Sequence, residues 1–164
     1  MSMRLSLLRL FILGLVMQSW GGYAQTDTAP LTVMINIIPP ECTVNNGQQI
    51  DIDFGAQVVT TEIDGINYKQ PIPANIDCKG YVNTMRLKFQ GVGSPFDGEL
   101  LKTSNDALGI RFLRPDGHAL PLNNWLDYSF FSVPALNAVL VKDNNQILLP
   151  GDFTATAMLV IEII

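Results

Sequence analysis

Hydrophobic and polar residues alternate most regularly over residues 153–164. One face of this run is wholly apolar and contains Phe153, Ala155, Ala157, Leu159, Ile161 and Ile163, whereas the other carries Thr154, Thr156, Met158, Val160, Glu162 and Ile164. Because successive side chains of a strand point to opposite sides, this pattern predicts a long β-strand. A strand this apolar requires a partner along its free edge, since an unpaired apolar edge promotes aggregation.

A second alternating run occupies residues 31–38. Leu31, Val33, Ile35 and Ile37 share one face, which predicts another strand. Pro39 and Pro40 follow directly, and they interrupt any ladder because proline cannot donate a backbone hydrogen bond. Two interpretations remain open: an ordinary first strand of a sandwich, or a detachable strand that pairs elsewhere.

Short alternating runs separated by turns divide the rest of the chain. The runs cover residues 50–54, 72–78, 85–89, 108–112, 128–134, 139–141 and 147–149, with turn sequences such as 45–47 and 115–117 among them. No segment keeps a helical period over ten residues. The pattern therefore predicts an all-β sandwich of immunoglobulin type with a two-layer core.

The first 24 residues have the pattern of a secretory signal peptide. Arg4 and Arg9 flank a short apolar run at residues 10–17, and small residues precede Gln25, as at a cleavage site. The uninterrupted apolar run is too short to span a bilayer, so we expect export and cleavage rather than a membrane anchor.

The chain contains two cysteines, Cys42 and Cys78. In an exported protein such a pair is most simply a disulfide. The competing interpretation, a zinc site, lacks ligands because the chain has a single histidine, His118, and no CxxC motif.

Charge and composition argue against nucleic acid and against catalysis. The formal net charge is -5, and it becomes -7 for residues 25–164 because the first 24 residues carry two arginines and no acid. An acidic domain is a poor partner for nucleic acid. His118 follows Asp116 in an apparent turn, and Asp51 and Asp53 fit the wet side of a half-buried strand. We therefore expect no enzyme activity, no cofactor and no metal site.

Several stretches in order resemble subunits of chaperone–usher pili. They are residues 38–47, 50–55 and 72–78 for the first half, and residues 108–112, Asp116-Gly117 and residues 151–157 for the second. The resemblance covers essentially all of the chain after the signal and is closest to the minor tip and adaptor subunits of P-type pili.

The resemblance implies an incomplete immunoglobulin-like sandwich whose seventh strand is missing. A periplasmic chaperone lends a strand to the resulting groove, and at the outer-membrane usher the N-terminal extension of the next subunit replaces it. This mechanism implies export through the periplasm to a cell-surface fimbrium. The expected division is a signal peptide at 1–24, a donor extension at 25–40 and a pilin domain at 41–164.

The resemblance also assigns site residues. The donor anchors are Leu31, Val33, Ile35 and Ile37, and the groove edge, which also binds the chaperone, contains Phe153, Ala155, Ala157, Leu159, Ile161, Ile163 and Ile164. Two positions depart from the family pattern: Ile35 stands where a glycine is usual, and Ile163 where a tyrosine is usual. The Ile164 carboxylate is expected to contact basic chaperone residues.

The resemblance favours a structural minor subunit, and two other functions remain as alternatives. One is a single-domain tip adhesin that binds a host glycan or protein receptor on its flank, where Trp125 could stack on a sugar or simply pack against the domain. The other is an exported enzyme or self-contained sandwich whose own N-terminal strand fills the groove.

Overall fold

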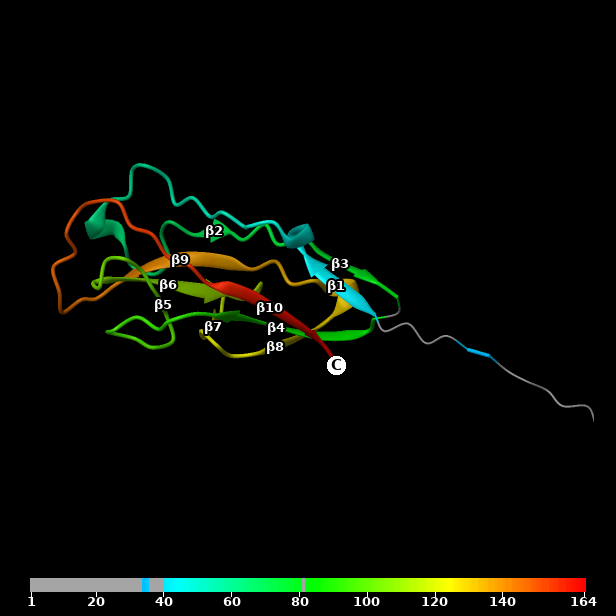
Figure 1. Ribbon diagram of the computed structural model, residues 1–164. Coiled ribbons are helices and arrows are strands. Elements are labelled where there is room, and N and C mark those ends of the chain that lie inside the picture. The colour runs from blue at the N-terminus through cyan, green and yellow to red at the C-terminus, as the bar shows by residue number, and fades with distance from the viewer. Residues whose placement is uncertain (1–33, 36–39, 81) are drawn as a thin grey trace, which may run out of the picture. The chain divides into compact units, whose positions relative to one another are not determined.

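The described residues form short antiparallel strands and no α-helix. A computed structural model describes residues 34–35, 40–80 and 82–164 (Figure 1). The strands are β1 (Glu41–Val44), β2 (Gln70–Pro71), β3 (Ile76–Lys79), β4 (Thr84–Gln90), β5 (Leu101–Lys102), β6 (Leu108–Leu113), β7 (Ala119–Leu120), β8 (Leu126–Ser129), β9 (Asn137–Lys142) and β10 (Met158–Ile163). Three 3-10 turns lie between them: η1 (Asn45–Gly47), η2 (Thr60–Glu62) and η3 (Phe130–Ser132). The predicted all-β class is confirmed.

The strands are arranged in three open sheets. The largest has the order β2-β9-β6-β5, with β7 also paired to β6; a second has the order β10-β4-β8; and β1 pairs with β3. Every pairing is antiparallel. Each sheet therefore ends in edge strands, and β10 is one of them.

The hydrophobic core joins β4 to β6. Met85 and Leu87 of β4 are fully buried, and the ring of Phe89 stacks on Phe112 of β6 with centroids 3.8 Å apart and an interplanar angle of 12°. Each such side chain stabilises the fold by roughly 1.5–3 kcal/mol on burial. The predicted inward faces of residues 85–89 and 108–112 are thus confirmed.

The disulfide predicted from the sequence is present. Cys42 and Cys78 are directly opposite each other on β1 and β3, with Cα atoms 4.0 Å apart, and they close a loop with a sequence separation of 36. This bond fixes the small β1–β3 sheet at the start of the domain.

The last strand is shorter than the sequence predicts. The prediction began at Phe153, but β10 begins at Met158, opposite Gln90 at the end of β4. Beyond Gln90, the next backbone carbonyl that would face β10 is that of Val92, and it accepts a hydrogen bond from the Lys102 N–H of β5 at 2.8 Å instead. The residues before β10 likewise bond elsewhere, because the Thr154 carbonyl accepts a hydrogen bond from the Ser104 N–H at 2.8 Å. The ladder with β4 therefore does not extend towards Phe153.

Four other predicted strands differ from the structure, and in one of them, the run at 72–78, the strand begins only at Ile76. Residues 50–54 keep the predicted alternation of burial but belong to no ladder, and residues 147–149 form a loop in which Ile147 and Leu149 are exposed. The run at 128–134 stops at Ser129, after which η3 begins. Alternation predicts which side chains are buried, but it does not predict whether a neighbouring strand is present to form a ladder.

The signal peptide and most of the donor segment lie outside the described residues. Leu31, Val33 and Ile37 are among them, as is Pro39. Ile35 is described and is 76% exposed.

Candidate functional site

β10 has a hydrogen-bonding partner on one side. It pairs with β4 from Met158↔Gln90 to Ile163↔Met85, and the N–H of Ile164 continues the pattern by donating to the Thr84 carbonyl at 3.1 Å. Within residues 40–80 and 82–164, no strand pairs with the other side of β10. The backbone groups on that side are therefore those of an edge strand.

The inward face of β10 and of the residues before it is only half covered. Phe153, Ala157, Leu159, Ile161 and Ile163 are partly buried and pack against the core; we call these five residues the apolar row. Ala155, predicted to share this face, is exposed. The side chains of the row thus contact the core but remain partly exposed to solvent.

The partners of the apolar row on β4 show how incomplete its coverage is. Met85 and Leu87 face Ile163 and Ile161 across the ladder, yet both are fully buried while the β10 residues are not. Tyr128 of β8 closes the far side of Met85, and its hydroxyl donates to the Met85 sulfur at 3.5 Å. Burial raises the pKa of Tyr128 above its usual value. The inward side chains of β4 are therefore more completely buried than those of β10.

Another apolar segment, which belongs to no ladder, meets the start of the row. Ile50, Ile52 and Phe54 are partly buried and pack on the core while Asp51 and Asp53 point to solvent; we call residues 50–54 the facing segment. Figure 1 shows this part of the chain running lengthwise between η1 and η2. The rings of Phe54 and Phe153 contact each other with centroids 6.1 Å apart.

The facing segment was predicted as a strand but not as part of the site. The available signal was the alternation of its apolar residues with Asp51 and Asp53. The facing segment belongs to no ladder and β10 has a ladder partner on one side, so both carry half-covered apolar side chains that another strand could cover.

The outer face of β10 carries an ion pair. Both Nε and Nη2 of Arg86 donate to Oε2 of Glu162, at 3.0 and 2.8 Å. Arg86 and Lys88 also lie over the ring of Trp125, 4.6 and 4.5 Å from its centroid. Trp125, considered above for sugar stacking, therefore already contacts two cations of β4.

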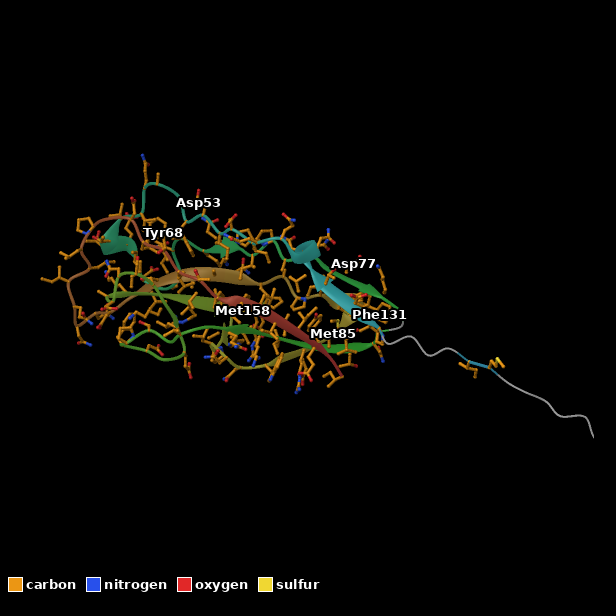
Figure 2. The ribbon with its side chains drawn as sticks, in the orientation of Figure 1. Asp53, Tyr68, Asp77, Met85, Phe131 and Met158 are labelled. Atoms are coloured by element: carbon orange, nitrogen blue, oxygen red, sulfur yellow. A yellow bond between two sulfur atoms is a disulfide. The ribbon has the colours of Figure 1, made fainter. Side chains whose placement is uncertain are left out.

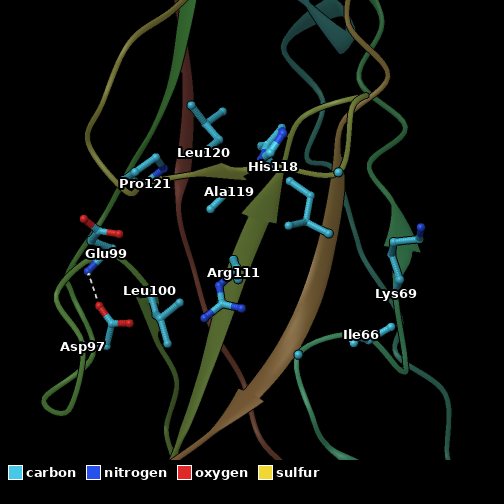
Figure 3. Close-up of a pocket in the computed structure, with 13 residues that line it drawn as sticks. Ile66, Lys69, Asp97, Glu99, Leu100, Arg111, His118, Ala119, Leu120 and Pro121 are labelled. Carbon is cyan, nitrogen blue, oxygen red and sulfur yellow. Dashed lines mark hydrogen bonds between the residues drawn. The ribbon is translucent and has the colours of Figure 1, made fainter.

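A depression of about 440 Å³ lies on the larger sheet (Figure 3). Lys69, Arg111 and His118 line it together with Asp97 and Glu99. The backbone N–H of His118 donates to Oδ1 of Asp116 at 2.9 Å, which fixes the predicted turn. No group of three His, Cys, Asp or Glu side chains suited to a metal ion occurs in the described part of the chain.

None of the described residues forms a helix with the length and apolar character needed to cross a membrane.

Comparison with known proteins identifies the family. The family model for fimbrial protein matches residues 31–163. The chain belongs to the fimbrial protein family. The resemblance drawn from the sequence is thereby confirmed.

Two fimbrial-like proteins of Escherichia coli (strain K12) are similar to this fimbrial protein. YfcR is 27% identical over 147 residues, which are 85% of this chain and 84% of YfcR. YfcQ is 27% identical over 128 residues, which are 74% of this chain and 78% of YfcQ.

Two solved structures share the fold. The P pilus adaptor subunit PapF superposes with a TM-score of 0.54 and 25% identity, covering 77% of this chain and 98% of PapF. The P pilus rod subunit PapA superposes with a TM-score of 0.54 and 17% identity, covering 82% and 99% of the two chains.

Family membership makes the chain a structural pilus subunit and not an enzyme. It associates with other pilus subunits, and the family implies export to a surface pilus. The immunoglobulin-like pilin fold accounts for the open sheets, with β10 at an edge.

Proposed function

We propose that this fimbrial protein is a minor pilus subunit that polymerises by donor-strand exchange. Residues 31–37 of one subunit pair with β10 of a neighbour and insert Leu31, Val33, Ile35 and Ile37 between the apolar row and the facing segment. The observation that carries this proposal is the half-covered apolar row on a strand with one described ladder partner.

The energetics favour such an exchange. Four aliphatic anchors contribute roughly 6–12 kcal/mol gross at about 1.5–3 kcal/mol for each buried side chain. Backbone hydrogen bonds to the free side of β10 add to this, because strand addition satisfies edge groups with main-chain partners. Ordering the extension offsets part of the gain.

Before assembly, a periplasmic chaperone holds the same edge and the outer-membrane usher exchanges it for the donor extension. In this scheme residues 1–24 are removed on export, residues 25–40 form the extension and residues 41–164 form the pilin domain. In the same scheme the Ile164 carboxylate contacts basic chaperone groups, which is supported by the 59% exposure of Ile164 directly after β10.

The minor role is supported by the similarity to an adaptor and by two side chains. PapF, one of the similar structures, is a P pilus adaptor subunit. Ile35, in place of the usual glycine, is a bulky anchor that fits only a groove with space at that point. Ile163 lies opposite Met85 and offers the incoming strand an apolar surface without a hydroxyl. Both side chains restrict which subunits can be neighbours in the pilus. Such a restriction is expected of a subunit that occupies one fixed position.

A deletion of residues 25–38 tests the proposal. We expect incorporation into pili to be lost while the chaperone complex still forms, because β10 is unchanged. Both quantities are measured separately, by quantifying the subunit in sheared pili and by co-purification from the periplasm. A matched control changes Thr32 and Asn36, on the opposite face of the extension, to serine and should assemble normally. Unchanged incorporation of the deleted chain would refute the donor assignment.

A further inference from the structure

We propose that Phe131 and Val133 form an end-on contact with the body of the neighbouring subunit that accepts residues 31–37. We call these two residues the exit patch. The inference rests on the proposed strand exchange and adds a second joint to it, made by the folded domains themselves.

The exit patch lies at the end of the domain where β1 begins. A Cβ atom on Gly80 would lie 3.4 Å from the Cα of Pro40, and three residues later the carbonyl of Asn83 accepts a hydrogen bond from the N–H of Phe130 at 3.0 Å. Phe131 follows directly. Figure 2 shows Phe131 at this end, beside the start of β1.

The patch is unusually apolar for an exposed position. Phe131 is 75% exposed and Val133 is 41% exposed. The partly buried ring of Phe130 packs edge-on against Phe131, with centroids 5.9 Å apart and an interplanar angle of 66°. Phe131 therefore presents a preoriented aromatic surface to solvent, of the kind that anchors protein contacts.

Covalent geometry brings the neighbour to this end. If Ile37 is the last anchor, three residues lead to Pro40, and three extended residues span at most about 10 Å. A domain of this size has a radius of gyration of about 13 Å. A body that wide, held within reach of Pro40, covers the surface around it, including the exit patch.

The opposite end of the domain has a matching apolar surface. Ile147 is 86% exposed and Leu149 is 68% exposed, in the loop that follows β9, whereas the exit patch precedes β9. The loop is held in place because the Asn105 side-chain amide donates to the Leu149 carbonyl at 3.3 Å. A strand of six residues, about 20 Å long, separates the two surfaces.

The orientation of the donor strand selects this loop as the partner surface. All ladders of the domain are antiparallel, and a donor that follows this rule places Ile37 near Phe153 of the acceptor. The body of the donating subunit then abuts the loop at residues 147–149 of a homologous acceptor. Because the two surfaces lie at opposite ends, the contact is heterologous and extends a filament.

Site-specific photo-crosslinking in assembled pili tests the contact. A photoreactive benzoylphenylalanine replaces Phe131 in the full chain, and the control replaces Ile66, which is similarly exposed (77%) but follows Gly65 beside Arg111 and Val141, away from the exit patch. We expect a crosslink between subunits from position 131 and none above background from position 66. Normal incorporation without a crosslink at 131 would overturn the end-on contact and leave strand exchange intact.

A substitution gives a second readout. Phe131→Ser should lower incorporation about tenfold in competition with the unchanged subunit, a typical effect of truncating an aromatic anchor at an interface. Ile66→Ser should compete equally. If Phe131→Ser also competes equally, the patch is not part of the joint. If the unchanged chain itself fails to enter pili, strand exchange is refuted and the contact falls with it.

Discussion

The rings of Phe54 and Phe153 contact each other with centroids 6.1 Å apart and an interplanar angle of 44°. Neither residue belongs to a ladder. The contact therefore joins the facing segment to the apolar row through side chains alone.

Removing this contact should weaken the domain. Phe153→Ala is expected to lower the free energy of unfolding by about 2 kcal/mol, less than the loss at a fully buried phenylalanine because Phe153 is half-buried. In a double-mutant cycle with Phe54→Ala, measured by urea unfolding, the two changes should couple by about 0.5–1.5 kcal/mol. Strict additivity would show that the rings do not support each other.

Charge placed on the apolar row should abolish strand uptake. Leu159→Asp together with Ile161→Asp buries two carboxylates once a strand covers them, which costs several kcal/mol without partners. We expect the chaperone complex to disappear from periplasmic extracts. Met158→Asp, on the exposed face of β10, is the matched control and should co-purify normally. Normal yield of the double variant would remove the row from the binding site.

The disulfide should contribute substantially to stability. Replacing Cys42 and Cys78 with serine opens a loop closed over a separation of 36 residues, and loss of a native disulfide in a small exported domain costs about 2–5 kcal/mol. Urea unfolding of the oxidised and the substituted chain measures the difference. Equal midpoints would show that packing alone holds β1 against β3.

Acid should destabilise the loop after β9 through Asp143. The N–H of Asn145 donates to Asp143 Oδ1 at 2.8 Å and the Gln146 side chain donates to Oδ2 at 2.7 Å, and these bonds lower the pKa of Asp143. A depressed folded pKa stabilises the fold above the usual aspartate pKa, and the effect disappears as pH falls through the depressed value.

Asp143→Asn should therefore flatten the acid limb of a stability-against-pH curve measured by urea unfolding. A second variant, Asp152→Asn, removes an exposed carboxylate and serves as the control. If Asp143→Asn leaves the acid limb unchanged, its hydrogen bonds do not favour the ionised form.

Side-chain alternation predicts which residues face the core better than it predicts where strands pair. Met85, Leu87, Phe89, Ile110 and Phe112 are buried as expected, because facing direction follows from local backbone geometry. The start of β10 depends on the bond from the Lys102 N–H to the Val92 carbonyl, which directs the chain after β4 towards β5. Such a contact leaves no periodic trace in the sequence.

One part of the site could be predicted from the sequence and the other could not, because alternation predicts the facing direction but not the neighbouring strand. The apolar row follows from the alternation of residues 157–163, whereas the role of residues 50–54 depends on which strand lies beside them. Ile147 and Leu149 alternate like strand residues but occupy an exposed loop. Alternation in the sequence predicts that one face of a segment is buried. It does not predict which part of the fold buries that face.

The disulfide has a mechanical consequence. If residues 25–40 link neighbouring subunits, any pull along the fibre reaches the domain at Glu41, one residue before Cys42. The covalent bond passes that tension to β3 before the β1–β3 hydrogen bonds can separate one by one. Chemical reduction would leave those hydrogen bonds to bear the tension alone, so the disulfide protects the first sheet of each subunit from being peeled apart.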